Sequence, residues 1–464
     1  MSDSYLPSAK YLDILDPIIQ DKNIELFQYY EHSPQSQDNL DRLGGIIQID
    51  ANATDSYLIP GKSYIHIKGQ LVGNDNSVYA GNSEIALINN AMMYLFESIS
   101  YQIGTTIVET IHSPGQVSTI LGLLSYPDDF NSSSGLMFGW SKDTTSHANS
   151  SKYNRLPNAN IAGDAPINAG TLTPVENPNY NQGFAARRNL LMSANPSGHF
   201  SFLIPFDHIF GFGDYTKAIY NVKHSLKFTR KTSDNEAIHR ANGVQDGKIK
   251  LTHISWRIPA LNIERGKLSE LRNIIENKQM IPVGYRARTT DSTILSQTRE
   301  FSWRTPALNG VEKPRWIIIG FQTNKNESQE QNPAVFDHLD LTSACVKLNT
   351  DEYPGEKFTI NFPTNDYSIL YEMFDRFKKE YYGFNSLVGG TQVNFSAFKS
   401  LFPILVFDVQ YQKERANETG IIDIQLKFSF ANPVPANTTA YITTISDRMY
   451  HLKSDGKNLV LISK

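Results

Sequence analysis

The sequence has few of the residues that cross-link, anchor or charge a protein. Cys345 is the only cysteine among 464 residues, which excludes an internal disulfide and a thiolate metal cluster. Within LTSACVKLN we expect it to be a small, half-buried strand residue. No run of 18 apolar residues occurs, so no membrane-spanning helix is predicted. The first residues lack a basic stretch followed by an apolar one, and we expect no secretory signal.

Charge is also scarce. Charged residues make up 19% of the chain and the formal net charge is -4, whereas soluble domains contain about 25% charged residues. Without a basic surplus, we expect no sequence-specific binding of nucleic acid. The polar character comes instead from Asn, Ser, Thr and Gln, a composition typical of a protein with many loops.

Common catalytic motifs are missing. There is no G-x-S-x-G, and the eleven histidines never occur as H-x-H or H-x-x-x-H. PGKS at 60–63 ends like a phosphate-binding loop, but Ser56 replaces the first glycine of that motif and no helix is expected to follow. GFGDYT at 211–216 lacks the third glycine of a dinucleotide-binding loop, and we interpret it as a turn.

Three histidines have carboxylates nearby in the sequence. In FDHIF (206–210) and EAIHR (236–240) we expect structural histidines with satisfied hydrogen bonds. FDHLDL contains the strongest cluster: Asp337, His338 and Asp340. On a strand, Asp337 and His338 would face opposite sides, which works against shared metal ligation. We therefore predict no catalytic, cofactor-binding or metal-binding residues, with a sandwich hydrolase using Asp337 and Asp340 as a lesser alternative.

The abundant residues favour β-structure. The chain contains 23 Tyr and 25 Phe, which suit strands better than helices. Apolar and polar residues alternate most clearly at 222–229 and 422–430. Each half of the chain has about eight such short strands separated by Pro and Gly turns. We therefore predict an all-β protein made of two tandem eight-stranded jelly-roll β-sandwiches with short inserted helices.

These patterns divide the chain into an N-terminal arm (1–42), a first jelly roll (43–262), a helical connector (263–278) and a second jelly roll (279–464). We expect the arm to be ordered in part by a partner. The first roll includes an irregular stretch, 126–197, which we interpret as a long surface loop or as short strands that the pattern does not reveal. Its ARRN segment is expected to hold solvated arginines, with contact to a glycan or an acidic surface as the alternative.

Apolar residues at helical spacing predict helices at 83–98, 114–125, 267–278 and 366–383. The third would connect the two rolls. The last has a mostly aromatic stripe and a polar face of mixed charge, which favours packing on a sheet over a membrane surface. Asp455-Gly456 is typical of a hairpin turn.

One stretch occurs twice. ISWRIPALN at 254–262 and FSWRTPALN at 301–309 share seven positions and begin 47 residues apart (301 minus 254). A duplicated jelly roll would repeat at roughly 200 residues. Because the proline in each copy cannot continue a central ladder, we interpret the two as independent strand endings, with a local duplication as the alternative.

Several of these segments together resemble a known family. The chain is similar to the double jelly-roll major capsid proteins of double-stranded DNA viruses, with polinton-like and adintovirus-like elements as the nearest lineage. The similarity lies in PFDHIFGFGDYTKAIYNVKHSL, ISWRIP, PRWIIIGFQT, FKKEYYG and GIIDIQLKFSF followed by TTAYITTISDR. These are strand and corner patterns rather than catalytic motifs.

The resemblance implies two upright jelly rolls side by side, three chains in a pseudo-hexagonal capsomer, and an icosahedral shell, and therefore a location in the virion. It implies no enzyme activity and no cofactor. The partners would be further copies of the chain, penton and minor capsid proteins, and a host receptor or glycan bound through 126–197. A jelly-roll carbohydrate- or receptor-binding protein, such as a lectin or spike, is the alternative.

Overall fold

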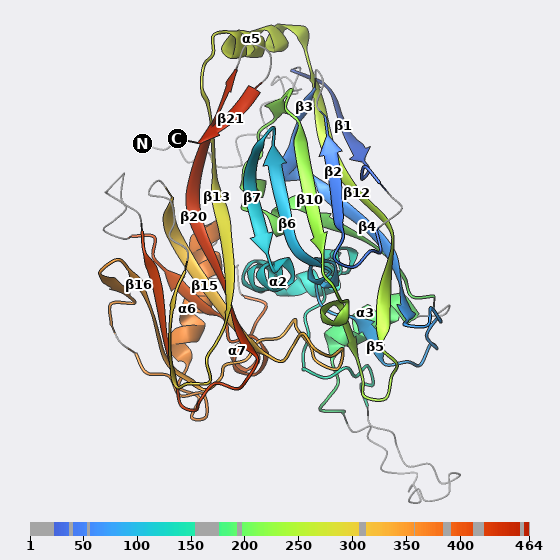
Figure 1. Ribbon diagram of the computed structural model, residues 1–464, viewed down its shortest axis with the longest axis vertical. Helices are drawn as coiled ribbons and strands as arrows, with labels where there is room; N and C mark the ends of the chain where they lie inside the picture. The colour runs from blue at the N-terminus through green and yellow to red at the C-terminus, as the bar shows by residue number, and fades with distance from the viewer. Residues whose placement is uncertain are drawn as a thin grey trace, which may run out of the picture.

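Two β-sandwiches lie side by side in the computed structural model, and their longest strands follow the long axis of the molecule (Figure 1). The structure describes residues 23–36, 40–52, 56–153, 176–192, 197–305, 312–356, 358–383, 391–411, 422–454 and 459–463. Within these residues strands predominate and the helices are short. The predicted all-β class is therefore confirmed.

The first roll contains two facing sheets and a small third one. The outer sheet has the order β8–β4–β12–β3–β9, with β1 also paired to β12. Its strands are β1 Ile24–His32, β3 Tyr57–Leu58, β4 Tyr64–Gly73, β8 His199–Pro205, β9 Ile219–Tyr220 and β12 Gly247–Ile263. The inner sheet, β2–β10–β6–β7, consists of β2 Ile46–Ala51, β6 Phe96–Ile103, β7 Thr106–His112 and β10 His224–Arg230. The small sheet pairs β5 Ile85–Leu87 with β11 Ile238–Arg240.

Buried aromatic residues join the two facing sheets. Trp256 of β12 lies edge-on to Tyr101 of β6, with ring centroids 6.1 Å apart. The indole Nε1 of Trp256 donates a hydrogen bond to Ser63 Oγ at 2.8 Å, so its polar group is satisfied inside the core. Leu226 and Phe228, from one of the stretches with predicted alternation, are buried in the same core.

The second roll has the same plan. One sheet has the order β13–β20–β15–β18, with β21 paired to β20. Its strands are β13 Ile281–Ile294, β15 Lys313–Thr323, β18 Leu405–Asp408, β20 Thr438–Ser454 and β21 Leu459–Ser463. The other sheet, β14–β19–β16–β17, consists of β14 Glu300–Arg304, β16 Leu341–Leu348, β17 Asp351–Tyr353 and β19 Ile424–Phe430. Phe321 of β15 meets Phe428 of β19 edge to face at 5.2 Å, so these sheets pack together.

Two further predictions concern this roll. Every second residue of β19 is buried, as predicted for 422–430. Cys345 is half-buried on β16, also as predicted. The expected Asp455-Gly456 turn lies outside the described residues, although the strands on either side of it, β20 and β21, pair antiparallel.

The described residues contain seven α-helices: α1 Ala91–Tyr94, α2 Pro114–Ser125, α3 Gln182–Met192, α4 Phe206–Ile209, α5 Arg265–Glu276, α6 Ser368–Tyr382 and α7 Phe395–Leu401. The predictions for α2, α5 and α6 are confirmed. The aromatic stripe of α6 packs on the second roll, where Phe377 contacts Trp316 with ring centroids 4.9 Å apart. Gly383 ends α6 with a φ of 69°, which glycine adopts without strain. α5 spans one end of the molecule between β12 and β13 (Figure 1).

The helix predicted for 83–98 is wrong. This stretch contains β5, the four-residue α1 and the start of β6. Asn90 has a φ of 63°, a left-handed conformation that interrupts a continuous helix. Its side-chain amide donates to Ser118 Oγ at 2.7 Å and to Thr119 Oγ1 at 3.1 Å. These tertiary hydrogen bonds override the apolar spacing that suggested a helix.

Part of the predicted N-terminal arm is a strand of the first roll. β1 pairs antiparallel with β12, from Ile24 opposite Ile263 to His32 opposite Trp256. Residues 1–22 lie outside the described part of the chain. The strand is therefore ordered by its own chain, whereas the arm was expected to be ordered in part by a partner.

The stretch 126–197 is not a loop throughout. Two short 3-10 helices occupy Asp128–Ser132 and Ser134–Phe138, and α3 forms near its end. Trp140, which follows the second 3-10 helix, is buried. Residues 154–175 and 193–196 lie outside the described part. The composition concealed these elements because none of them is long enough to produce a periodic pattern.

The repeated stretch is a strand ending in only one of its copies. In the first copy, β12 continues through Pro259. The pairing of β12 with β4 ends at Arg257 and its pairing with β3 begins at Ala260, so the proline occupies a break in the ladder on this edge. On the other edge Pro259 lies opposite Tyr29 of β1. In the second copy, β14 does end at Arg304, and 306–311 lie outside the described residues.

Candidate functional site

The rolls meet along the open edge of β7, the last strand of the inner sheet (Figure 1). Tyr285 Oη on β13 and Arg448 Nη1 on β20 donate to the Val108 carbonyl at 3.1 and 2.8 Å. The His112 amide donates to Thr290 Oγ1 at 2.8 Å. An uncovered edge strand can pair with other chains. The side chains of the second roll occupy this edge, and they fix the two rolls relative to each other.

Glu109, on the same strand, is the main polar residue of this interface. Its side chain is buried and accepts hydrogen bonds from the amides of Gly211, Phe212 and Arg288 at 3.2, 3.1 and 2.7 Å. Burial raises the pKa of Glu109, while the positive charge of Arg288 and the three amides oppose that rise. The carboxylate therefore holds a turn of the first roll and a strand of the second at one point.

The apolar core is continuous across the interface. One cluster of buried apolar residues includes members of both rolls. Phe212 and Tyr285, one from each roll, have ring centroids 5.0 Å apart. Tyr94 Oη donates to the Pro333 carbonyl at 2.8 Å, again between the rolls. Because their hydrophobic surfaces are buried together, the rolls form one rigid unit.

A cavity of about 480 Å³ opens between the rolls, bordered by Tyr126, Asp207, His208 and Arg288 among others. His208 is bonded through both ring nitrogens, to Tyr126 Oη at 2.6 Å and to Asn90 Oδ1 at 3.0 Å. Burial lowers the pKa of His208 to about 3, so its ring is neutral. Arg288 donates to the carbonyls of Asp207 and His208 at 2.8 and 3.0 Å. These polar groups are used in packing, as predicted for the histidine of FDHIF.

The Asp337, His338 and Asp340 side chains do not converge on one point. Asp337 accepts from the Thr323 amide at 2.8 Å and pairs with Lys325 at 3.3 Å, whereas His338 Nδ1 lies 3.3 Å from Asp340 Oδ1. The segment was expected to be a strand, but it forms a turn before β16. The hydrolase alternative thus lacks a shared carboxylate site at these residues.

The two glycine-containing motifs have structural roles. PGK of PGKS forms a 3-10 helix at Pro60–Lys62, and the strand β4 follows it. Ser63 Oγ donates to the Pro60 carbonyl at 2.6 Å and accepts from Trp256. The predicted turn at 211–216 is a 3-10 helix at Gly211–Asp214 whose first amides bind Glu109.

The prediction that the arginines of ARRN are solvated is wrong. Arg187 and Arg188 are buried in α3. Arg187 pairs with buried Asp143 at 2.6 Å and donates to the Leu87 carbonyl at 2.8 Å. Arg188 donates to the carbonyls of Ser83 and Gly81, both at 2.7 Å. The stretch 126–197 is therefore anchored to the first roll near its end.

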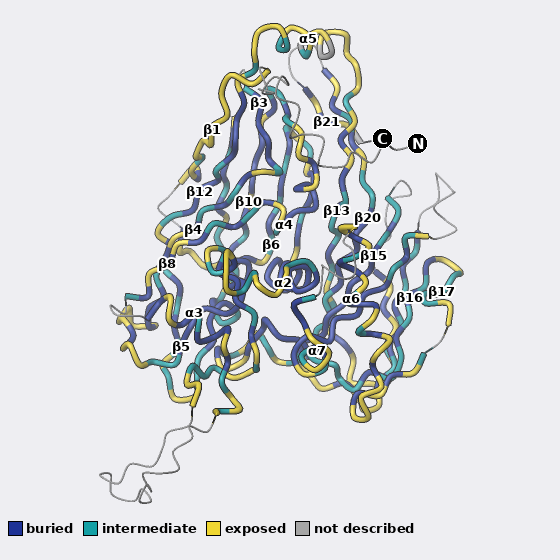
Figure 2. The backbone as a smooth tube through the Cα atoms, turned by 180° about the vertical axis from the view of Figure 1, so that it is seen from behind, coloured by how far each residue is buried: buried dark blue, intermediate teal, exposed yellow. Residues whose placement is uncertain are grey.

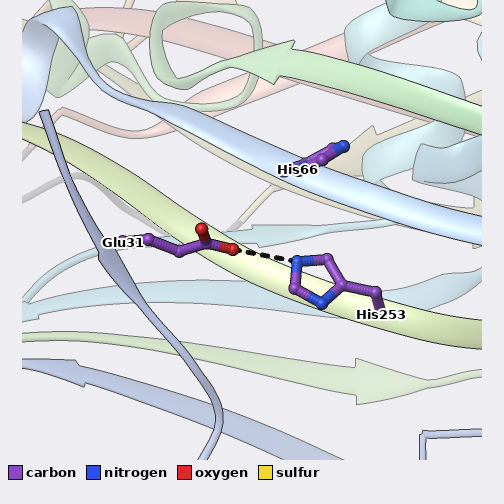
Figure 3. Close-up of side chains that lie close together, drawn as sticks. All are labelled: Glu31, His66 and His253. Atoms are coloured by element: carbon purple, nitrogen blue, oxygen red, sulfur yellow. Dashed lines mark hydrogen bonds and ion pairs between the residues drawn. The ribbon is translucent and has the colours of Figure 1, made fainter.

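A further polar cluster lies on the outer face of the outer sheet. Glu31 on β1, His66 on β4 and His253 on β12 present one possible ligand atom each, and these atoms all lie within 4.8 Å of one another (Figure 3). The sequence analysis missed this cluster. Its members are up to 222 residues apart (253 minus 31), and only the register of three strands brings them together.

Most of the exposed residues of β1 are apolar. Figure 2 shows the strand as exposed. Its exposed apolar residues are Ile24, Leu26, Phe27, Tyr29 and Tyr30, with 37–47% of each residue accessible. Exposed apolar residues that gather on one strand often mark a surface that contacts another protein.

None of the helices in the described residues is long and apolar enough to cross a membrane. The architecture as a whole defines the class of the protein: two jelly rolls in one chain, fixed side by side by a buried interface. The chain matches the double jelly roll-like domain over residues 168–450, more than half of its length, and it belongs to that family. The resemblance drawn from the sequence is confirmed at this level, while the polinton-like lineage stays a prediction.

Solved structures share the fold over almost the whole chain. The match to the structure of the Sputnik virophage spans 100% of this chain and 93% of the Sputnik chain, with a TM-score of 0.59 and 12% identity. The match to the Faustovirus major capsid protein spans 98% of this chain and 94% of the Faustovirus chain, with a TM-score of 0.54 and 9% identity. The match to the mavirus major capsid protein spans 99% of this chain and 93% of the mavirus chain, with a TM-score of 0.52 and 12% identity. A comparison with curated protein sequences finds no match.

Proposed function

We propose that this chain is a major capsid protein whose trimers form pseudo-hexagonal capsomers of an icosahedral viral shell. The observation that carries the proposal is the rigid pairing of two upright jelly rolls through β7, β13 and β20. A shell unit needs walls that keep their shape under lateral load. Two sandwiches joined by a common core and by buried hydrogen bonds supply such walls.

Lateral contact between copies is the second element of the proposal. In a closed cyclic trimer each chain presents two different faces, and one of them receives the other. β1 supplies an apolar strip for one of these faces, and it belongs to the outer sheet, on the side of the first roll opposite the second roll (Figure 1). The low charge of the chain reduces the desolvation cost of such contacts.

The capsid role carries further proposals. The chain would reside in the virion, would contact penton and minor capsid proteins, and would act without catalysis or cofactor. Receptor or glycan binding through 126–197 would add to the shell function. The competing proposal, a lectin or spike, predicts glycan binding by a protein that does not assemble.

Light scattering during size-exclusion chromatography tests the proposal. We expect a mass three times the 52.3 kDa of one chain. Phe27→Asp places a charge on the apolar strip and should shift the protein toward the monomer. Ile294→Asp is the matched control, because Ile294 is also exposed but belongs to β13 of the second roll. A stable monomer at high concentration would contradict the proposal, and glycan-array binding by that monomer would favour the lectin alternative.

A further inference from the structure

The cluster of Glu31, His66 and His253 has the composition of a metal site. Residues opposite each other in a ladder share a face, and Glu31 lies opposite Arg257 of β12 while His66 lies opposite Ser255. Three adjacent strands therefore hold the two imidazoles and the carboxylate on the outer face of the sheet. Figure 3 shows the carboxylate of Glu31 directed at the ring of His253, and the Oε1–Nε2 distance is 3.0 Å.

The spacing of the donor atoms is close to what a small cation requires. Zn²⁺ binds histidine nitrogen and carboxylate oxygen at about 2.0–2.2 Å, so a tetrahedral site separates its ligand atoms by roughly 3.3 Å. One pair is already at 3.0 Å and all three atoms lie within 4.8 Å. Small side-chain rotations would bring all three ligand atoms to the spacing of a tetrahedral zinc site. Two imidazoles with one carboxylate suit zinc and its neighbours among the transition metals better than Mg²⁺ or Ca²⁺.

Hydroxyl groups around the cluster orient the two rings. Ser201 Oγ lies 2.9 Å from His66 Nε2, and Ser255 Oγ lies 3.0 Å from His253 Nε2. The rings themselves meet edge to face, with centroids 5.3 Å apart. Ser255 bonds the same His253 nitrogen that faces Glu31, so a bound metal ion would replace this hydrogen bond.

The charges around the cluster keep the donors in metal-binding form. Burial, Lys68, His253 and Arg257 lower the pKa of His66, which favours the neutral imidazole, while Glu31 has the opposite effect. The pKa of Glu31 is also lowered, first by the hydrogen bond from Ser255 and then by His253 and Arg257, so the carboxylate is ionised. The cationic groups on this face repel a free metal ion, so the two imidazoles and the carboxylate must outweigh that repulsion.

We propose that Glu31, His66 and His253 bind one Zn²⁺ ion, which fastens the edge strand β1 to β4 and β12. The fourth coordination position faces solvent, because about half of the Glu31 side chain is accessible. In the described residues, β1 pairs with β12 as its only strand neighbour. The ion would therefore add a second attachment, at the end of β1 that leads into the rest of the roll.

Isothermal titration of metal-stripped full-length protein with ZnCl₂ tests the site. We expect one ion per chain, and His66→Gln, His253→Gln and Glu31→Gln should each weaken binding by more than about 10-fold, since even outer-shell changes commonly cost that much. His199→Gln is the matched control, because His199 is exposed on the same face of the same sheet, on β8. This control should bind Zn²⁺ like the wild type.

Hydrogen exchange of the β1 amides supplies a second measurement. Zn²⁺ should slow their exchange in the wild type and in His199→Gln, and it should leave the His253→Gln variant unchanged. Equal melting temperatures without metal show that the variants are folded. Equal Zn²⁺ affinity in all variants, or no binding by the wild type at millimolar Zn²⁺, would overturn the proposal.

Discussion

Replacing Glu109 with alanine removes a buried carboxylate that links the two rolls. The substitution leaves the amides of Gly211, Phe212 and Arg288 without their acceptor. Each unsatisfied buried donor costs about 1–3 kcal/mol. Because some water will enter the space and satisfy part of these donors, we expect Glu109→Ala to lower the free energy of unfolding by about 3–5 kcal/mol.

Two further variants isolate the cause. Glu109→Gln keeps an acceptor oxygen and the size of the side chain, so its loss should be smaller, about 1–3 kcal/mol. Glu97→Ala removes an exposed carboxylate from the neighbouring strand β6 and should change stability by less than about 0.5 kcal/mol.

Urea unfolding followed by tryptophan fluorescence measures these differences, because Trp256 reports on the first roll and Trp316 on the second. If the free energy of unfolding of Glu109→Ala lies within about 0.5 kcal/mol of the wild-type value, the carboxylate does not stabilise the interface. Two separate transitions in the wild type would show that the rolls unfold independently and do not form one rigid unit.

Other predictions follow from buried groups. Burial lowers the pKa of His224 to about 3, against about 6.5 in the unfolded chain. The unfolded chain therefore binds more protons between these values, so the contribution of His224 to stability is complete above pH 6.5 and declines as pH falls. His224→Gln should reduce the slope of unfolding free energy against pH by up to about 1.4 kcal/mol per pH unit, measured by urea titrations at pH 6.5–4.5. Arg187→Met leaves the buried Asp143 carboxylate without its arginine partner. The substitution should lower the free energy of unfolding by about 3–5 kcal/mol, measured by calorimetry or urea unfolding. Trp256→Ala should lower the free energy of unfolding by about 3–5 kcal/mol in the same assay. Trp303→Ala, at the matching position of the repeated stretch, should lower it by less, because Trp303 is 8% exposed and Trp256 is fully buried.

Elements whose signals are local could be predicted from the sequence. α2 begins at a proline and α6 ends at a glycine, and the apolar spacing of each fits one helical face. The alternation of β19 reflects a strand with one buried face. The double jelly-roll architecture followed from the number of such strands and from the resemblance of their patterns.

Features that depend on long-range contacts could not be predicted in this way. Asn90 adopts a left-handed conformation, stabilised by hydrogen bonds that its side-chain amide donates to a helix almost thirty residues away, and the apolar spacing of 83–98 does not reveal this contact. Arg187 can be buried because it pairs with Asp143 and donates a hydrogen bond to the Leu87 carbonyl. The cluster of Glu31, His66 and His253 depends on the register of β1 and β4 against β12, which no local pattern encodes.

Electron microscopy of the purified wild-type protein in negative stain tests the central proposal most directly. If the paired rolls are the building block of a shell, class averages will show three copies around one axis with a pseudo-hexagonal outline, in which each chain contributes two lobes. Isolated two-lobed particles at all protein concentrations, with no threefold classes, would contradict the account.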